Sequence, residues 1–360
     1  MERVTKYLQN LIKTKNLPYL EVLATKDGKT VYSNRFFKDK TYEHSGLCFM
    51  FSMSKPITIV AGLKLVEQGL IKFSDKVYKF LPFVKECYYI ENGKKINAGE
   101  DLTVFNLFTM TSGLDYNLET PEIVEAFNKN PDIDTFSALK IKLSNPLQFK
   151  PGARYNYSLS HDLLGAVIES VSKKRFADFV KDEIFAPLGM NNSTFNYVES
   201  GVSNVYIMKN GNPTTFNIEH LWVNSKNYQS GGGGLKSTAS DYVIFAKTLA
   251  NNGVCENGYR LLNENSINLL KTPLISNDLG FNCVHGNFYE YGYGVRVRIK
   301  DTAWGLKKGE FGWDGAAGSF LLVDTENNLS IVVGMNLVEW PNVLEGAHMK
   351  ICEKIYKEIL

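Results

Sequence analysis

The stretch SMSKPIT at residues 52–58 is the most informative part of this sequence. It follows the apolar run Leu47–Phe51 and begins a segment, residues 55–69, with apolar residues at helical spacing. Ser52 and Lys55 are three positions apart, about one helical turn, so their side chains face the same side. The start of a helix also places free N–H groups near the serine oxygen. Because a buried lysine can act as a base, Ser52 is a candidate nucleophile.

Ser-x-x-Lys alone is a weak motif, and this chain contains it three times. Ser137 and Lys140 lie in a charged stretch, and Ser170 with Lys173 lies at the polar end of a predicted helix. The copy that begins at Ser52 differs because an apolar run precedes it and an apolar helix follows it. Context therefore favours the first copy.

Two further segments are candidates for the same site. Tyr157-Ser158-Leu159 lies directly before a predicted helix at residues 160–171. The glycine-rich stretch GWDGAAG at 312–318 leads into a predicted strand, and its small residues allow a substrate backbone to lie against that strand. Each segment also has an ordinary explanation, a core tyrosine in one case and a tight turn in the other.

The predicted fold class is α/β (α+β), with a mostly antiparallel sheet built from both termini. Residues 1–60 and 285–360 are expected to form an α/β domain, residues 61–284 a mostly helical domain, with the active site in the cleft between them. Strand-like runs lie at residues 19–25, 29–36, 294–299, 319–323 and 329–335. Helical patterns lie at residues 4–12, 55–69, 104–110, 160–171, 176–185, 240–251 and 342–360.

The composition excludes several classes of protein. The chain has 360 residues, of which 44% are hydrophobic and 22% charged, so a largely disordered chain is excluded. Its 40 basic and 38 acidic residues give a net charge of +2, which does not predict nucleic acid or an anionic membrane as partner. No apolar run approaches the roughly 20 residues of a membrane helix. The N-terminus lacks the apolar core of a secretion signal, so we expect a cytoplasmic protein. The sequence leaves the oligomeric state open, as a monomer or a weak dimer.

Other motifs carry no site in this interpretation. Residues 231–238, GGGGLKST, resemble a phosphate loop, but Leu235 separates the glycines from the lysine. We expect a tight turn that lines the cleft. No G-x-S-x-G elbow is present, and His161 is expected to be structural. The five cysteines form no C-x-x-C and are expected to be reduced thiols, and the histidines show no metal-ligand spacing: His44, His161, His220, His285 and His348.

Taken together, these segments resemble the serine penicillin-recognising family, which includes class C β-lactamases, D-Ala-D-Ala peptidases and β-lactamase-like esterases and acyltransferases. The resemblance covers nearly the whole length and implies that family's mixed α/β fold with an inserted helical region. The motifs occur in the family's order: SMSKPIT at 52–58, LTV at 102–104, TMTSGL at 109–114, PG at 151–152, YS at 157–158, LLG at 163–165, PLGM at 187–190 and residues 231–238.

The resemblance implies a mechanism. Ser52 would be acylated, Lys55 would lower its pKa or take its proton, and Tyr157 would pass the proton to the leaving group and later activate water. The backbone N–H groups of Ser52 and Ala316 would form the oxyanion hole. No metal or cofactor would take part.

Two departures from the β-lactamase pattern bear on the substrate. Leu159 stands where that pattern has asparagine, and Trp313 stands where it has a cation that could bind a substrate carboxylate. We therefore expect a serine esterase or acyl transferase that acts on a small acyl substrate through contacts with Trp313, Gly315, Leu159 and Ser112. A β-lactamase or D-Ala-D-Ala carboxypeptidase is the alternative, since an arginine from elsewhere could bind a carboxylate, and a non-catalytic binder is a second alternative.

Overall fold

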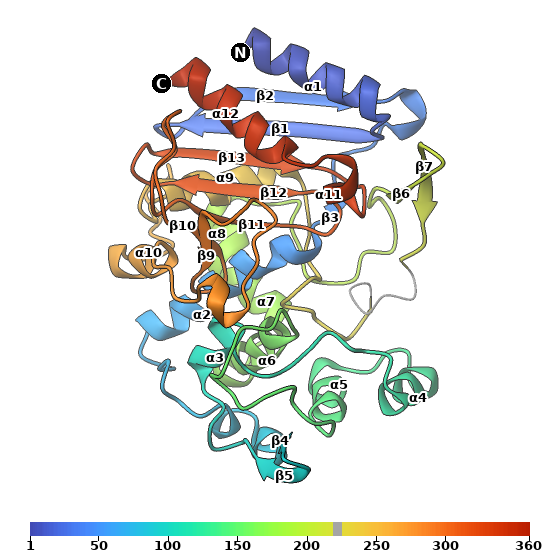
Figure 1. The fold of residues 1–360 in the computed structure, drawn as a ribbon, viewed down its shortest axis with the longest axis vertical. Helices are drawn as coiled ribbons and strands as arrows, with labels where there is room; N and C mark the ends of the chain where they lie inside the picture. Colours follow the sequence, from blue (N-terminus) through green and yellow to red (C-terminus); the bar gives the residue numbers. More distant parts are fainter. Residues whose placement is uncertain (219–224) are drawn as a thin grey trace.

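The computed structural model describes residues 1–218 and 225–360, and His220 lies outside these ranges. Its centre is a seven-stranded antiparallel sheet in the order β2-β1-β13-β12-β11-β10-β9 (Figure 1). Strands from both ends of the chain meet where β1 pairs with β13. The strands are β1 (Tyr19–Lys26), β2 (Lys29–Phe37), β9 (Tyr289–Tyr291), β10 (Arg296–Arg298), β11 (Phe311–Asp314), β12 (Phe320–Asp324) and β13 (Leu329–Gly334).

Helices cover both faces of the sheet, because its strands are apolar on both sides. In β12, Phe320 and Leu322 face the terminal helices α1 (Glu2–Lys15) and α12 (Ala347–Ile359). Leu321 and Val323, which alternate with them, belong to the core on the opposite face. There α9 (Ala239–Ala250) packs against β1, β12 and β13. Figure 1 shows α1 and α12 side by side in front of the sheet, with α9 behind it.

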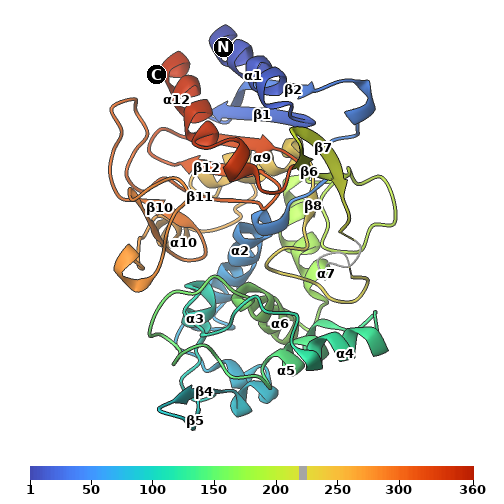
Figure 2. The same cartoon turned by 45° about the vertical axis from the view of Figure 1, so that its right-hand side comes forward.

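The central helix α2 (Ser54–Glu67) connects the sheet to the helical region (Figure 2). Every residue from Ser54 to Leu65 is buried, which is typical of a helix surrounded by other elements. It packs against α6 and α7. The other helices here are α3 (Val104–Phe108), α4 (Pro121–Lys129), α5 (Thr135–Lys142), α6 (Ser160–Ser172), α7 (Phe176–Val180), which continues as a π-helix (Lys181–Phe185), and α8 (Ala186–Leu188).

The predicted fold class is confirmed, whereas several elements differ from the prediction. Strands β9 and β11 were not predicted, since they are short and β11 contains a glycine and an aspartate, which are rare in strands. The helix expected at 342–360 is broken at Gly346, whose φ of 68° ends the pattern. Also unpredicted were α4, α5, α10 (Glu264–Leu270), α11 (Trp340–Val343) and the pairs β3 (Cys48–Phe49) with β8 (Lys236–Ser237), β4 (Tyr88–Glu91) with β5 (Lys94–Asn97) and β6 (Val205–Lys209) with β7 (Asn212–Phe216).

The division into two domains stays a prediction. Within it, α9 was assigned to residues 61–284, the helical part, yet it lies on the sheet. Among the described residues, no helix is both long and apolar enough to cross a membrane.

Candidate active site

Ser52 lies in a 3₁₀ turn, Phe51–Met53, that joins β3 to α2. Phe51 has a φ of 46°, in the left-handed region that residues other than glycine rarely adopt. Such a conformation persists only where the surroundings enforce it, and it is common next to reacting groups. Ser52 lines a cavity of about 510 Å³, so its hydroxyl can meet a ligand.

Lys55 lies one turn further along and is fully buried. Its Nζ is 3.1 Å from Ser52 Oγ, 2.9 Å from the hydroxyl of Tyr116 and 2.7 Å from the carbonyl oxygen of Gly232. Three oxygens, none of them a carboxylate, therefore surround this nitrogen. The predicted pairing of Ser52 with Lys55 is present in the structure.

Tyr157 reaches the same serine from the segment before α6. Its hydroxyl lies 2.5 Å from Ser52 Oγ, although the two residues are 105 positions apart. The Lys55 Nζ lies 4.4 Å from the centre of the Tyr157 ring, and Trp313 Nε1 lies 3.4 Å from the Tyr157 oxygen. The structure thus brings together the three side chains that the resemblance assigned to catalysis.

The end of β11 forms the wall next to Ser52. Gly315 is required there, because an added Cβ would lie 2.1 Å from Ser319 Oγ and 2.6 Å from the Met50 carbonyl oxygen. Ser52 and Ala316 both line the cavity. The Ala316 amide forms no hydrogen bond with any other part of the chain that the structure describes. It is therefore available to a ligand, while the oxyanion hole itself stays a prediction.

Aromatic rings form most of the remaining wall. Tyr155 and Trp313 face Phe281, with ring centres 5.2 Å and 6.4 Å from it, and Trp340 lines the same cavity. Burial raises the pKa of the Cys283 thiol in this wall to about 12, so that thiol is a poor nucleophile. The complete lining is Ser52, Tyr155, Asn156, Tyr157, Gly280, Phe281, Asn282, Cys283, Val284, Arg296, Trp313, Asp314, Gly315, Ala316 and Trp340.

A charged network borders the cavity beside Trp313. Asp314 Oδ2 is 3.3 Å from Arg296 Nη1, and its Oδ1 is 2.8 Å from His285 Nε2. Burial raises the pKa of the Asp314 carboxyl, but His285 and Arg296 lower it more and hold it well below its usual range. Arg296 also approaches Glu310, at 3.4 Å, and the carbonyl oxygen of Leu321, at 2.8 Å.

His285, Asp314 and His348 are the described residues that could hold a metal ion. One potential ligand atom from each lies within 4.8 Å of the other two. The search for ligand spacing missed this group, because its two histidines are 63 positions apart. The Arg296 guanidinium already pairs with the same carboxylate and would repel a cation. The geometry therefore favours a charge network that holds the end of β11.

Two residues predicted to contact the substrate do not line the described cavity. Leu159 is fully buried and lines a separate small pocket together with Leu139 and Tyr228. Ser112 is also fully buried, and its hydroxyl bonds to Ser160 at 2.8 Å. Their contact with a substrate stays a prediction that this cavity does not support. Trp313 and Gly315, in contrast, do line it.

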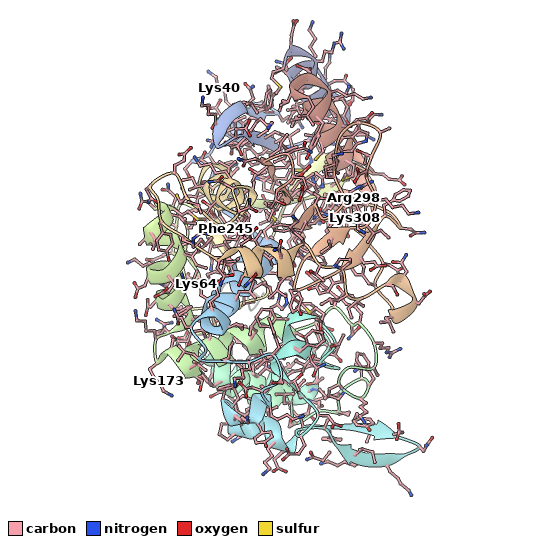
Figure 3. The ribbon with its side chains drawn as sticks, turned by 90° about the vertical axis from the view of Figure 1, so that its left-hand side faces the viewer. Lys40, Lys64, Lys173, Phe245, Arg298 and Lys308 are labelled. Atoms are coloured by element: carbon pink, nitrogen blue, oxygen red, sulfur yellow. The ribbon has the colours of Figure 1, made fainter. Side chains whose placement is uncertain are left out.

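His161 matches its expected structural place. It is fully buried and does not line the cavity, and burial, together with Lys55, lowers its pKa well below the usual value. The neighbouring Asp162 is buried as well, and burial raises its pKa to about 6. The other Ser-x-x-Lys lysines, Lys140 and Lys173, are exposed, and Figure 3 shows Lys173 at the edge of the molecule.

Sequence reasoning missed the role of Tyr116 and misplaced that of residues 231–235. Tyr116 was not singled out, because nothing in the sequence around it marked it as a partner of Lys55. The glycine-rich turn was expected to line the cleft, and it lies behind Lys55 instead, where Gly231 and Gly232 accept hydrogen bonds from Thr58 and Lys55. An added Cβ at Gly232 would lie 2.5 Å from the Asp162 carboxylate, so the glycine is needed for this approach.

A family model described as Beta-lactamase matches residues 4–351 of the chain. Among curated proteins, Protein Rv1367c of Mycobacterium tuberculosis is 23% identical over 308 residues, which cover 78% of this chain and 75% of that protein. Protein flp of Staphylococcus aureus (strain MW2) is 27% identical over 232 residues, which cover 61% of this chain and 44% of that protein.

Solved structures share the fold at low sequence identity. EstCE1, described as a hydrolase with promiscuous acyltransferase activity, superposes with a TM-score of 0.81 at 20% identity over 99% of this chain and 98% of its own. Simvastatin Synthase (LovD) from Aspergillus terreus superposes with a TM-score of 0.83 at 18% identity, over 99% of this chain and 98% of its own. The octameric penicillin-binding protein homologue from Pyrococcus abyssi superposes with a TM-score of 0.72 at 21% identity, over 98% of this chain and 77% of its own.

Proposed function

The chain belongs to the beta-lactamase family, and from that premise we propose that it is a serine hydrolase or acyl transferase that forms an acyl-enzyme on Ser52. An ester of a small acyl group is the favoured substrate. The observation that carries the proposal is the position of Ser52 Oγ, within reach of both Lys55 and Tyr157 on the wall of a cavity.

Lys55 is well placed to receive the serine proton. An unprotonated amine has two N–H donors and one lone pair. The Gly232 carbonyl can only accept, and the Tyr116 hydroxyl oxygen can also accept, so these two groups take both N–H bonds. The lone pair is then left for the Ser52 hydroxyl, which lies 3.1 Å away. Loss of that proton makes the serine oxygen a nucleophile toward an acyl carbon.

Tyr157 is well placed for the second proton transfer. Its oxygen lies between Ser52 and the Trp313 N–H, so it borders the space where a leaving group must depart. As the bond from the acyl carbon to the leaving oxygen breaks, the leaving oxygen takes a proton from Tyr157. The Ser52 and Ala316 amides would stabilise the oxyanion, and losing one such donor typically costs roughly 3 kcal/mol of barrier.

Water or an acceptor alcohol completes the cycle. Its oxygen gives a proton to the Lys55–Tyr157 pair and bonds to the acyl carbon, the Ser52 ester bond breaks, and the pair returns the proton to Ser52 Oγ. Hydrolysis and acyl transfer differ only in the acceptor that enters. The open aromatic wall suits an apolar acyl group or an apolar acceptor.

Covalent labelling tests the proposal. A fluorophosphonate should add one adduct to the wild-type protein, measured as intact mass, and none to the Ser52→Ala variant. Ser137→Ala is the matched control, since Ser137 belongs to an exposed copy of the same motif. Turnover of 4-nitrophenyl butyrate without hydrolysis of a cephalosporin would support the esterase. The reverse result would favour the β-lactamase, and labelling that survives Ser52→Ala would contradict the proposal.

A further inference from the structure

Arg296 occupies an unusual place in the cavity. Within residues 1–218 and 225–360, it is the only lysine or arginine in the cavity wall. A cation beside an acyl-transfer site is the natural partner of a substrate carboxylate. The Arg296 side chain, however, is fully buried and packs over the Phe320 ring, 4.6 Å from its centre. Whether it can bind an anion depends on the partners it already has.

Both terminal nitrogens of the Arg296 guanidinium already face acceptors within the protein. Nη1 faces Asp314 at 3.3 Å, and Nη2 faces the Leu321 carbonyl oxygen at 2.8 Å and Glu310 at 3.4 Å. Nε is buried and has no hydrogen-bond partner among the described residues. A carboxylate in the cavity therefore meets terminal nitrogens that already have acceptors and an Nε that is enclosed by protein atoms.

The Asp314 carboxylate lies where a substrate anion would have to bind in order to pair with Arg296. Its side chain is 16% exposed, while those of Arg296 and Glu310 are fully buried. Asp314 also lines the cavity, next to Trp313 and Gly315. A carboxylate that approached Arg296 from the cavity would first meet a negative charge, and the like charges would repel each other.

We propose that Asp314 is a specificity-determining residue that occupies Arg296 and thereby excludes substrates with a carboxylate at this end of the cavity. The substrate class is therefore acyl compounds that are uncharged where they meet Trp313 and Asp314. This inference rests on the proposed acyl-enzyme chemistry and narrows its substrate. It also explains how an arginine can lie in the wall without providing a site for the carboxylate of a β-lactam.

Two pairs of esters test this inference on the full chain. The first pair is mono(4-nitrophenyl) glutarate and its methyl ester, and the second is 3-butyryloxybenzoate and its methyl ester. Within each pair only the charge differs, and the carboxylate lies on the acyl side in one and on the leaving-group side in the other. The readout is the ratio of kcat/KM for the neutral ester to that for the anionic ester, which does not depend on how much enzyme is folded.

The wild type should prefer the neutral ester of each pair at least about tenfold. Asp314→Asn should lower that preference by about 10- to 100-fold in one or both pairs, the range expected for one charge-assisted hydrogen bond. Adding Arg296→Gln to this variant should abolish the gain on the anionic ester. A wild type that hydrolyses both esters of each pair equally, or an unchanged preference in Asp314→Asn, would overturn the inference.

Glu310→Gln is the matched control. It removes the other carboxylate on Arg296, but Glu310 does not line the cavity. Its preference should differ from that of the wild type less than threefold. An equal shift in both variants would show that the position of Asp314 in the wall is irrelevant, and it would overturn the assignment.

A binding measurement separates this inference from the proposed function. In the Ser52→Ala background, which cannot form an acyl-enzyme, isothermal titration compares benzoate with benzamide. Asp314→Asn should tighten benzoate binding at least about tenfold and leave benzamide within threefold. If no ester is turned over, the proposed function fails and this titration still decides the inference, since equal benzoate binding with and without Asp314 would contradict it.

Discussion

The two sides of the cavity hold their buried cations in different ways. On the side of the nucleophile, the Lys55 Nζ contacts a hydroxyl of Ser52, a hydroxyl of Tyr116 and a carbonyl oxygen. In the wall that β10 and β11 form, Arg296 lies between the carboxylates of Asp314 and Glu310. The carboxylates beside Arg296 stabilise its positive charge. The neutral oxygens around the Lys55 amine do not form an ion pair with it, so proton exchange with Ser52 stays possible. The first side is therefore suited to moving protons, and the second to a fixed charge that selects the substrate.

Two buried aspartates show the same difference. Burial raises the pKa of Asp162 to about 6, since hydrogen bonds and Lys55 offset only part of the desolvation. Burial also acts on Asp314, but His285 and Arg296 hold its pKa well below the usual range. Desolvation raises the pKa of both carboxyl groups, but the net shifts have opposite signs because the number and sign of the neighbouring charges differ.

Replacement of Lys55 by methionine should have the largest effect. Lys55→Met removes the proton acceptor of Ser52, so kcat/KM for 4-nitrophenyl butyrate should fall by roughly 1,000- to 10,000-fold. Lys64→Met is the matched control, because Lys64 is a buried lysine on the same helix that bonds to Tyr259 and Glu183 away from the cavity (Figure 3). The control should keep its activity within threefold. A Lys55→Met variant with a tenth of the wild-type activity would break the comparison.

Replacement of Gly315 by alanine should have the next largest effect. The added Cβ meets the Met50 carbonyl oxygen and Ser319, so Ala316 must move away from Ser52. Loss of one oxyanion donor lowers kcat about 100-fold or more. Gly165→Ala in α6 is the control, since its Cβ has its nearest neighbour at an ordinary 3.6 Å and its φ is not positive. An unchanged kcat in Gly315→Ala would show that this strand end does not serve the transition state.

The pH dependence of stability should have opposite signs for the two aspartates. The folded pKa of Asp162 is raised, so its stabilising contribution is present below about pH 4 and lost as the pH rises through 6. The difference in unfolding free energy between Asp162→Asn and the wild type should therefore shift in favour of the variant by about 2 to 3 kcal/mol as the pH rises from 4 to 7.

Asp314→Asn provides the contrast in that experiment. The folded pKa of Asp314 is lowered, so its contribution is present above its ordinary pKa and lost as the pH falls below that value. The variant should be less stable than the wild type at pH 7, and this difference should shrink below about pH 4. Urea unfolding at pH 3 to 7 measures the unfolding free energy of each variant and of the wild type. If both variants differ from the wild type by an amount that changes with pH in the same direction, the two aspartates do not differ as proposed.

Replacement of Tyr116 by phenylalanine should have the smallest effect. Tyr116→Phe removes one oxygen from Lys55, and kcat/KM should fall about tenfold, as expected for one hydrogen bond. Tyr259→Phe is the control, because its hydroxyl bonds to Lys64 at the same distance of 2.9 Å but outside the cavity. Equal activity of the two variants would show that Tyr116 only fills space.

The proximity of Ser52 to Lys55 could be predicted because the two residues are only three positions apart in the sequence. Ser52 and Lys55 are one turn apart on a helix, so their proximity follows from local geometry. Tyr157 came from the resemblance, since no local rule links residues 105 positions apart. The sequence also did not show that Leu159 and Ser112 are buried away from the described cavity, because packing inside the helical region decides this.

The sheet also contains elements that local sequence patterns do not predict. Strands β1, β12 and β13 have apolar residues facing two cores, and their patterns predicted them. Strands β9 and β11 have three and four residues, and pairing with β10 and β12 stabilises them more than their own composition does. One of the two strands that the pattern missed, β11, therefore contributes Trp313 and Asp314 to the cavity wall.

The sequence by itself determined the family, the fold class and the proximity of Ser52 to Lys55, because helical period and motif order are properties of neighbouring residues. Only the tertiary structure decided which groups surround Lys55 and that Asp314 lies against Arg296 and two histidines. These contacts join segments far apart in the chain. Their positions depend on how the sheet, the terminal helix and the loops pack, which no local pattern records.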